Sequence, residues 1–267
     1  MADLVAPSAD GTPVTALDDG SGPPLLLVHW GAGSANCWDG VARSLIGDFR
    51  VVRIARRIYV PGAVVPQDHS MAVEAADVRA IAARLDRPAL LVGHSSGAVA
   101  ALEAAVRAPE LWAGLVLYDP PVPTTSLVGA GAARRARAAL DAGDFDEVMR
   151  IHLRDIAQEP PEVVAALTAD PKTRAAYAAK AEAGLADTDA IDALGVGVDR
   201  FTSLDVPTTL VAGERSPAHL RQRIADLADA LPHARVVTLL GQGHAAHRTA
   251  PGTLAEVIRE AAERAFG

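Results

Sequence analysis

Six short, mostly apolar runs recur along the chain, and longer amphipathic segments separate most of them. The runs lie at 25–28, 51–54, 89–92, 115–118, 209–212 and 236–239. Runs of this length without regular polar alternation are typical of strands buried on both faces of a parallel sheet. The segments 71–86, 97–108, 217–230 and 252–265 carry apolar residues at helical spacing. This alternation predicts an α/β fold with a mostly parallel, doubly wound sheet and helices on both faces.

Two regions depart from this rhythm. The first 24 residues contain turn sequences at 10–11 and 18–22, which predict one or two antiparallel strands at the edge of the sheet. Residues 120–201 open with several prolines and then show helical segments at 129–142, 144–157, 160–168, 171–183 and 187–194. We expect residues 121–200 to form a helical cap inserted into a core made of 1–120 and 201–267. The alternative is that these helices thicken one face of the sheet.

Composition and charge narrow the class of protein. The chain has 267 residues, of which 50% are apolar, so one large α/β domain with an insertion can bury a sizeable core. A net charge of -8 gives no general attraction for nucleic acids or anionic membranes. The short basic run 134–137 is interpreted as a solvated helix face. With one cysteine, Cys37, no internal disulfide forms, and no metal site is expected. No signal peptide or membrane-spanning run is recognised, which predicts a cytoplasmic protein.

The strongest site motif is the pentapeptide Gly93-His94-Ser95-Ser96-Gly97, which follows an apolar run and precedes a helical segment. A serine on a sharp turn between strand and helix is typical of a nucleophile elbow, in which the flanking glycines avoid clashes with the neighbouring elements. We therefore expect Ser95 to be a nucleophile and the backbone N–H of Ser96 to be an oxyanion donor. The alternative is a chance match in a glycine-rich loop, which the strand–turn–helix context disfavours.

A serine hydroxyl needs a general base, and the chain offers eight histidines. His244 lies in a Gly-x-Gly-His loop just after the last apolar run, at the edge of the sheet from which a base could reach Ser95. His247 is its competitor and is expected on a helix or at the rim of the site. His29 and His94 lie close to the site and are interpreted as structural or substrate-contacting. The others, His69, His152, His219 and His233, are expected at the surface.

Two acidic residues that end strands compete to orient His244. Asp119 follows the strand after Ser95, whereas Glu214 follows the run at 209–212. Hydrolases that place the acid at the later strand usually have Asp three residues after the glycine, and this chain has Ser216 there. We favour Asp119, whose alternative role is a turn cap. Glu214 is kept as the second candidate.

The oxyanion hole requires a second N–H donor beside that of Ser96. The loop after the run at 25–28 reads His29-Trp30-Gly31-Ala32-Gly33-Ser34, and Gly31 is the expected donor. Trp30, His29 and His94 are the expected substrate-binding residues. The glycines also suggest a phosphate loop, but no Lys-Ser/Thr follows and the dinucleotide spacing is missing, which disfavours nucleotide binding.

Together these motifs resemble the α/β-hydrolase superfamily over nearly the whole chain. The matching pieces are the stretches 26–29 with its glycine loop and Trp38, 92–97, 115–120 and 241–244, with Pro251 seven residues further on. The resemblance is to bacterial members with a serine nucleophile in which the strand after the nucleophile ends in Tyr-Glu/Asp-Pro. Some relatives, including a group of haloalkane dehalogenases, take their acid from this strand end, which supports Asp119. A dehalogenase itself is disfavoured, because those enzymes have Asp in place of Ser95.

The chain departs from the family pattern in two loops. Many members have His-Gly where this chain has His29-Trp30, so a bulky ring stands beside the oxyanion loop. Many members also carry Asp-Arg-Arg-Gly-x-Gly-x-Ser after the fourth strand, and here residues 55–62 read Ala-Arg-Arg-Ile-Tyr-Val-Pro-Gly. Because β-branched residues replace both glycines of the pattern, we expect this loop to take a different path.

The resemblance and the motifs predict a serine hydrolase that cleaves a small-molecule carboxylic ester, thioester or lactone without a cofactor. Ser95, His244 and Asp119 would form the triad, and Gly31 and Ser96 the oxyanion hole. The expected partner is a small-molecule substrate, with no nucleic acid and no membrane, and the chain is compatible with a homo-oligomer. The alternatives are a cyclase, lyase or cofactor-free peroxidase on the same residues, or a ligand-binding member without turnover.

Overall fold

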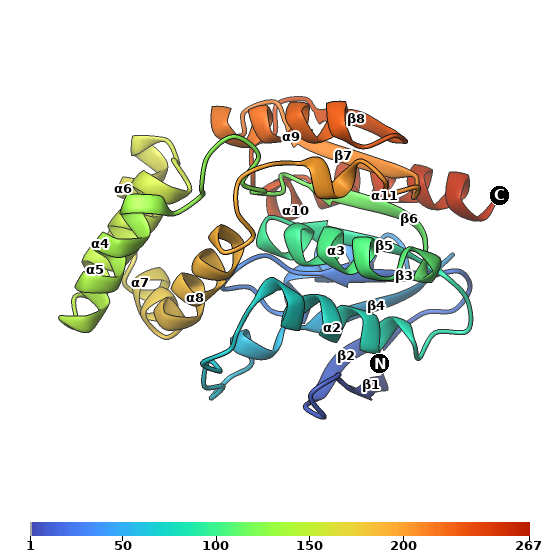
Figure 1. Cartoon of the computed structure of the whole chain (residues 1–267), viewed down its shortest axis with the longest axis horizontal. Coiled ribbons are helices and arrows are strands. Elements are labelled where there is room, and N and C mark those ends of the chain that lie inside the picture. Colours follow the sequence, from blue (N-terminus) through green and yellow to red (C-terminus); the bar gives the residue numbers. More distant parts are fainter. Residues whose placement is uncertain (1) are drawn as a thin grey trace.

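Eight strands form one twisted sheet in the computed structural model, which describes residues 2–267 (Figure 1). Their order across the sheet is β1-β2-β4-β3-β5-β6-β7-β8. β1 and β2 pair antiparallel, as do β2 and β4, and every pair from β4 to β8 is parallel. The strands are β1 (Ala2–Pro7), β2 (Pro13–Asp19), β3 (Pro24–Val28), β4 (Arg50–Ala55), β5 (Ala89–His94), β6 (Trp112–Tyr118), β7 (Thr208–Gly213) and β8 (Ala234–Leu239).

Helices cover both faces of this sheet. α2 (Met71–Ala82), α3 (Ser96–Arg107) and α9 (Ala218–Ala230) contribute to one apolar cluster, and α1 (Asp39–Ala42), α10 (Ala246–Thr249) and α11 (Pro251–Phe266) to the other. The side chains of β3 alternate between the two clusters, with Leu26 and Val28 in the first and Leu25 and Leu27 in the second. A strand buried on both faces needs apolar residues at every position, which explains the unbroken run in the sequence. The predicted fold class is confirmed.

The chain reverses its direction of winding at β3. β4 lies on one side of β3 and β5 on the other, so the loops that follow β3 and β5 leave adjacent strands at the same edge. In open α/β sheets such a switch point is where ligands bind, at the carboxyl ends of the strands. The sheet therefore brings the segment 29–34 next to the turn at Ser95.

Between β6 and β7 the chain forms helices and no strand, as the sequence indicated. Figure 1 shows α4 to α7 standing beyond one end of the sheet, with α8 nearest to it. These helices share a small apolar cluster of their own, which includes Ala136, Ile151 and Leu185. Their bounds are α4 (Ala130–Asp141), α5 (Phe145–Ile151), the π-helix η4 (His152–Ile156), α6 (Pro161–Ala169), α7 (Pro171–Ala178) and α8 (Ala181–Asp192). We call residues 121–200 the insertion.

The last helices of the insertion differ from the sequence expectation. Helices were expected at 171–183 and 187–194, whereas α7 stops at Ala178 and α8 runs unbroken through Asp187. The break falls at Lys180, whose φ of -123° and ψ of 7° are not helical and whose side chain donates hydrogen bonds to the loop after β3. Sequence periodicity could not show this, because the competing partner is a distant loop.

Short 3-10 helices complete the architecture at η1 (Ala35–Trp38), η2 (Arg57–Tyr59), η3 (Pro109–Leu111) and η5 (Asp199–Phe201). The helix η2 lies within residues 55–62, the loop in which two glycines of the resembled pattern are replaced. Its residues Ile58 and Tyr59 are buried. Among residues 2–267, none of the helices is both long and apolar enough to cross a membrane.

Candidate active site

Ser95 occupies a strained turn between β5 and α3. Its φ of 54° and ψ of -129° lie outside the regions that L residues ordinarily adopt, and such strain persists only where the surroundings enforce it. Every residue from 89 to 105 is buried except Ser95, which is partly exposed. The turn therefore lifts this one side chain out of the packed strand and helix.

The two glycines of the pentapeptide are required by close backbone approaches. A Cβ on Gly93 would lie 2.5 Å from the Cα of Ala98, and one on Gly97 would overlap the carbonyl oxygen of His29. Both contacts are tighter than real side chains tolerate. The N-terminus of α3 is consequently pressed against the chain that leaves β3, and Ser96, the first helical residue, brings its N–H to this junction.

Asp119 lies beside His244. The Oδ2 atom of Asp119 is 3.0 Å from Nδ1 of His244, and Asp119 itself is fully buried. Its φ of 44° is again left-handed, which turns the end of β6 sharply at the sheet edge. Its backbone N–H donates to the carbonyl of Val211 on the neighbouring β7. A shielded carboxylate in this position can hold the imidazole in one orientation.

Glu214, the other candidate acid, points elsewhere. It is exposed, and its Oε2 accepts a hydrogen bond from the backbone N–H of Gly241 at 2.6 Å. The turn at Gly241, and not His244, thus supplies the hydrogen-bond donor to this carboxylate. Ser216 turns inward and donates to Oδ2 of Asp119 at 2.5 Å.

The loop that carries His244 is held by the hydroxyl of Tyr118. This hydroxyl donates to the carbonyl of Gly243 and accepts from the N–H of Ala246 at 3.2 Å. Burial, followed by the neighbouring Asp119, raises the pKa of Tyr118 well above its ordinary value, so the hydroxyl stays a donor. Tyr118, which precedes Asp119 in the chain, thus holds the loop on both sides of His244.

The expected oxyanion residues lie together at the switch point. Gly31, Ser95 and Ser96 line one cavity. A Cβ on Gly31 would lie 3.3 Å from the Oγ of Ser96, which measures how closely the loop after β3 approaches the start of α3. The two backbone N–H groups belong to segments in direct contact, as a two-donor oxyanion hole requires.

Of the three expected substrate-binding residues, Trp30 and His94 line the cavity and His29 does not. His29 is buried, with Nδ1 2.8 Å from the carbonyl of Trp30, and its Nε2 accepts from the N–H of Arg56 at 3.2 Å. These contacts require the neutral imidazole with its proton on Nδ1. Burial, followed by the charge of Arg56, lowers the pKa of His29 to about 3. Of the two roles expected for His29, substrate contact is therefore corrected and the structural role is favoured, because its strand-end position turns the ring into the core.

His247 is buried against the ring of Trp30, with centroids 3.7 Å apart. His94 stacks on Tyr118 at 4.6 Å and lies 4.6 Å from the ring of His244 and 4.8 Å from that of His247. Burial lowers the pKa of His247 to about 3 and that of His94 well below its ordinary value. These neutral rings pack against one another beside His244, and His247 lies on the short helix α10, one of the two positions expected for it.

A cavity of about 870 Å³ opens over Ser95 and His244. Loops of the sheet edge form its floor, and the insertion contributes an apolar wall of Val128, Leu153, Ile156, Val163, Leu167 and Ile191. A cavity of this size that is mostly apolar with a few polar groups is typical of small-molecule sites. Sequence patterning could not locate this wall, since its members come from three separate helices and a linker.

Three polar residues in or near the cavity were missed or misplaced. His152 was expected at the surface, but it packs against Tyr177 with centroids 5.7 Å apart, and burial lowers its pKa to about 4. His219 was also expected at the surface, yet it lines the cavity half-buried, and burial followed by Arg223 lowers its pKa to about 4. Glu159, which the sequence did not single out, lines the same cavity, and burial raises its pKa. Helical periodicity alone does not show which polar residues a cavity admits.

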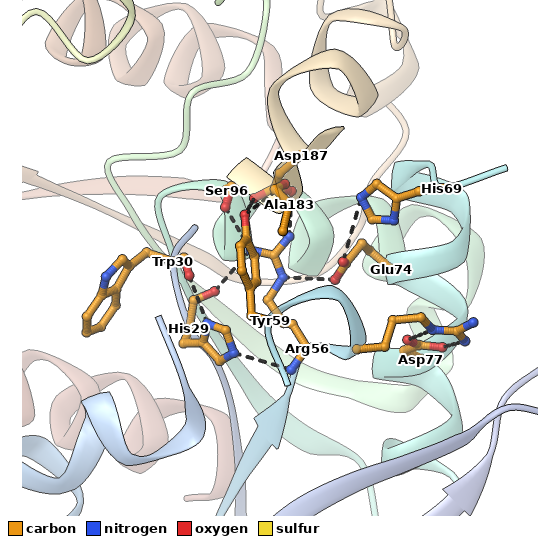
Figure 2. A network of polar contacts seen from close by, with 11 residues as sticks. His29, Trp30, Arg56, Tyr59, His69, Glu74, Asp77, Ser96, Ala183 and Asp187 are labelled. Carbon is orange, nitrogen blue, oxygen red and sulfur yellow. Dashed lines mark hydrogen bonds and ion pairs between the residues drawn. The ribbon is translucent and has the colours of Figure 1, made fainter. Parts of the chain in front are cut away.

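His69 was likewise expected at the surface, but its side chain is only 3% exposed and lies 3.9 Å from Glu74. His233 is 57% exposed, as expected. The partner of His69, Glu74, belongs to a buried cluster that the sequence did not reveal (Figure 2).

At the centre of this cluster is Arg56, whose side chain is fully buried. Its guanidinium donates to Glu74 at 2.9 Å, to Asp187 of the insertion at 2.6 Å and to the Oγ of Ser96 at 2.8 Å (Figure 2). Tyr59 donates to the other oxygen of Asp187 at 2.7 Å. A buried cation with two carboxylates and a hydroxyl is thus built against Ser96, the residue that follows Ser95.

His69, Glu74 and Asp187 offer oxygen and nitrogen atoms that lie within 4.8 Å of one another, a spacing that could suit a metal ion. The guanidinium of Arg56, however, already occupies the space between the two carboxylates. A metal ion here would have to displace a buried, fully hydrogen-bonded cation, so this donor set does not fit one.

Comparison with known proteins identifies the family. The model of the alpha/beta hydrolase family matches residues 25–257, from β3 into α11. The chain belongs to this family. Among solved structures, an α/β hydrolase from Sphaerobacter thermophilus DSM 20745 is 29% identical, with a TM-score of 0.83 over 96% of this chain and 99% of that one.

Two curated relatives of this α/β hydrolase match over shorter segments. An uncharacterized hydrolase, YraK, of Bacillus subtilis (strain 168) is 35% identical over 104 residues, which are 38% of each chain. A non-heme haloperoxidase of Rhodococcus erythropolis is 36% identical over 92 residues, which are 34% of each chain. The alignments thus span little more than a third of these relatives, and they support the family without specifying the reaction.

Proposed function

We propose that this α/β hydrolase cleaves a small-molecule carboxylic ester, thioester or lactone through an acyl-enzyme on Ser95. One observation carries the proposal: Ser95 on its strained turn and His244, paired with buried Asp119, face the same cavity. A nucleophile, a base and an orienting acid are the parts that acyl transfer requires. The family membership of the chain supports the same reading.

In the proposed reaction His244 removes the proton from the hydroxyl of Ser95 as its oxygen attacks the substrate carbonyl. Asp119 holds Nδ1 of His244 and stabilises the positive ring that forms. The N–H groups of Gly31 and Ser96 bind the oxyanion, and the leaving group takes the proton from His244. Water, activated by His244, then releases the acid and restores Ser95. Ser95, His244 and the attacking water supply every proton donor and acceptor that this reaction needs.

The insertion would act as the cap over this site. Its apolar wall favours a substrate with a hydrocarbon portion, and a cavity of about 870 Å³ accommodates a molecule of modest size. The nearby polar groups Glu159 and His219 would contact the less apolar end. This arrangement favours a small-molecule ester over a polymer or a long-chain lipid.

Covalent labelling tests the proposal directly. The wild-type protein should react with a fluorophosphonate at Ser95 and hydrolyse a panel of p-nitrophenyl esters. Ser95→Ala should lose labelling and at least about three orders of magnitude of turnover, while Ser203→Ala, a change at an exposed serine, should retain both. Labelling that persists in Ser95→Ala would contradict the assignment of the nucleophile.

The similarity to a non-heme haloperoxidase raises a second candidate, in which hydrogen peroxide replaces water as the acceptor of the acyl group. The acyl-enzyme would be the same, and the product would be a peracid instead of an acid. Measuring acid and peracid release from one ester with and without peroxide separates the two reactions. Peracid formation that outpaces hydrolysis at millimolar peroxide would favour the second candidate.

A further inference from the structure

Asp187 is a carboxylate in the middle of α8 that faces the core. It is buried, and it accepts hydrogen bonds from Arg56 at 2.6 Å and from the hydroxyl of Tyr59 at 2.7 Å. Burial opposes its ionisation, but the charge of Arg56 and these hydrogen bonds hold the pKa of Asp187 below its ordinary value. The insertion therefore extends a fixed negative charge toward the sheet edge.

The contacts of this carboxylate converge on the oxyanion loop. A Cβ on Gly31 would lie 3.3 Å from Oδ2 of Asp187, from the hydroxyl of Tyr59 and from the hydroxyl of Ser96. Arg56 joins the group by donating to Ser96 at 2.8 Å (Figure 2). The two segments expected to supply oxyanion N–H groups are thus packed against one cluster, to which the insertion contributes the carboxylate of Asp187 and, through Tyr59, the carbonyl of Ala183.

A second side chain of the insertion holds the same loop from its other end. Lys180, the residue just before α8, donates from Nζ to the carbonyl of Ala32 at 2.7 Å and to that of Gly33 at 2.9 Å. Lys180 is half-buried, and burial lowers its pKa. Ala32 has a φ of 58°, so the carbonyls at this turn need a fixed donor to stay in place.

We propose that α8 sets the geometry of the oxyanion loop, with Asp187 and Lys180 as positioning residues. This proposal rests on the proposed function for its catalytic meaning. Asp187, through Arg56 and Ser96, would keep Gly31 packed against the start of α3. Lys180 would hold the carbonyls of Ala32 and Gly33 by hydrogen bonds. The insertion would thereby act on the reaction itself as well as on access to the cavity.

The physical reason is that an oxyanion hole works only when its N–H groups are aimed before the reaction begins. A short glycine-rich loop does not keep its N–H groups in one orientation by itself, because glycine permits many backbone conformations. Buried, charge-assisted hydrogen bonds are shorter and stronger than neutral ones, so they can restrict the loop. Misalignment of the donors weakens binding of the transition state more than binding of the substrate.

The substitution Asp187→Asn tests the first contact. It keeps the shape of the side chain and leaves Arg56 paired with Glu74 at 2.9 Å, so the buried cation retains one carboxylate. We expect kcat for ester hydrolysis to fall by about 10- to 100-fold with KM within about twofold, less than the loss of an entire oxyanion donor. The matched control is Asp189→Asn, since Asp189 is on the same helix and forms an exposed ion pair with Arg137.

Lys180→Met tests the second contact, with Lys172→Met, a change at an exposed lysine of α7, as its control. We again expect kcat to fall, by about tenfold, with KM retained, since Nζ donates to two carbonyls of the oxyanion loop. Unchanged kcat in both Asp187→Asn and Lys180→Met overturns the proposal. So does a loss confined to KM, which would make these residues substrate contacts.

Amide hydrogen exchange tests the same contacts without any activity. In the unliganded protein, exchange of residues 29–34 should become at least about tenfold faster in Asp187→Asn and in Lys180→Met, and stay unchanged in both controls. Equal exchange in all five proteins overturns the proposal even if Ser95 is active. Faster exchange in a protein whose Ser95 does not label would support the positioning and contradict only the proposed function.

Discussion

Ser216 donates a hydrogen bond to Asp119, with its Oγ 2.5 Å from the Oδ2 atom that also faces His244. The two residues follow neighbouring strands, β7 and β6, and meet at the same edge of the sheet. In relatives that take the acid from the later strand, Asp stands where this chain has Ser216. Here the serine occupies that place and holds the carboxylate offered by the earlier strand.

Replacing each candidate acid by its amide should affect turnover very differently. Asp119→Asn is expected to lower turnover by roughly four orders of magnitude, because the amide favours the wrong tautomer of the histidine it contacts. Glu214→Gln should remain within about twofold of wild type, since its carboxylate accepts only from the exposed turn at Gly241. Steady-state ester hydrolysis checks both, and a large loss in Glu214→Gln with a silent Asp119→Asn would move the acid to β7.

Removing the hydroxyl of Ser216 should have a smaller effect. Ser216→Ala leaves Asp119 buried with one hydrogen bond fewer, and a hydrogen bond to a charged group contributes about 1.5–3 kcal/mol. We expect kcat to fall by about tenfold and the melting temperature to fall by a few degrees. Ser203→Ala is the control at an exposed serine. A variant of Ser216 that matches this control in both measurements would show that the contact is dispensable.

His244 and His247 should also behave differently. His244→Ala should lose nearly as much activity as Ser95→Ala, because residues that act as one unit are not additive. His247→Phe keeps an aromatic ring against Trp30 and should retain at least about a third of wild-type kcat. Single-turnover acylation measures the effect on the first chemical step. Comparable losses in the two histidine variants would implicate both rings in proton transfer.

Low pH should destabilise the folded protein through its buried histidines. The pKa of His247 is lowered to about 3 in the folded state, and the unfolded chain has an ordinary value of about 6.5. The unfolded state therefore binds more protons below pH 6.5, and the free energy of unfolding decreases as the pH falls from there toward 3. One such histidine accounts for about 2 kcal/mol between pH 7 and pH 5.

His247→Phe removes this titrating ring, so its free energy of unfolding should depend less on pH, by about 2 kcal/mol across that interval. Urea unfolding at pH 7 and pH 5 measures the difference. The exposed His233 provides the control, because His233→Phe should leave the slope close to that of wild type. Identical slopes in wild type and His247→Phe would mean that His247 is protonated in the folded protein.

Glu159 should select among substrates by charge. Among residues 2–267 its carboxylate has no hydrogen bond or ion pair, and it lines the cavity within electrostatic reach of His244. We expect an ester with a quaternary ammonium group to have a higher kcat/KM than its neutral isostere, by about tenfold at low salt. Glu159→Gln should remove this preference, whereas Glu110→Gln, at an exposed residue of η3 outside the cavity lining, should keep it. Equal preference in wild type and Glu159→Gln would exclude this role.

Local sequence patterns were sufficient to predict the sheet, the elbow and the histidine loop. Each buried strand needs several consecutive apolar residues, so β3, β5 and β6 can be recognised without knowledge of their partners. The turn at Ser95 is likewise recognisable from its glycines. Gly93 avoids a clash with the start of α3, and Gly97 avoids one with the end of the adjacent parallel strand β3. These features depend on residues close in sequence or on the general geometry of parallel sheets.

Only the tertiary structure places Asp119, and not Glu214, beside His244, since both residues follow strands at one edge and the direction of a side chain depends on its surroundings. Only the tertiary structure brought Asp187 to Arg56, 131 residues earlier in the chain. It also turned His152, His219 and His69 away from solvent, contrary to their polar sequence context. Contacts of this kind leave no periodic signal, because a buried charge needs only one partner, and folding can bring that partner from any part of the chain.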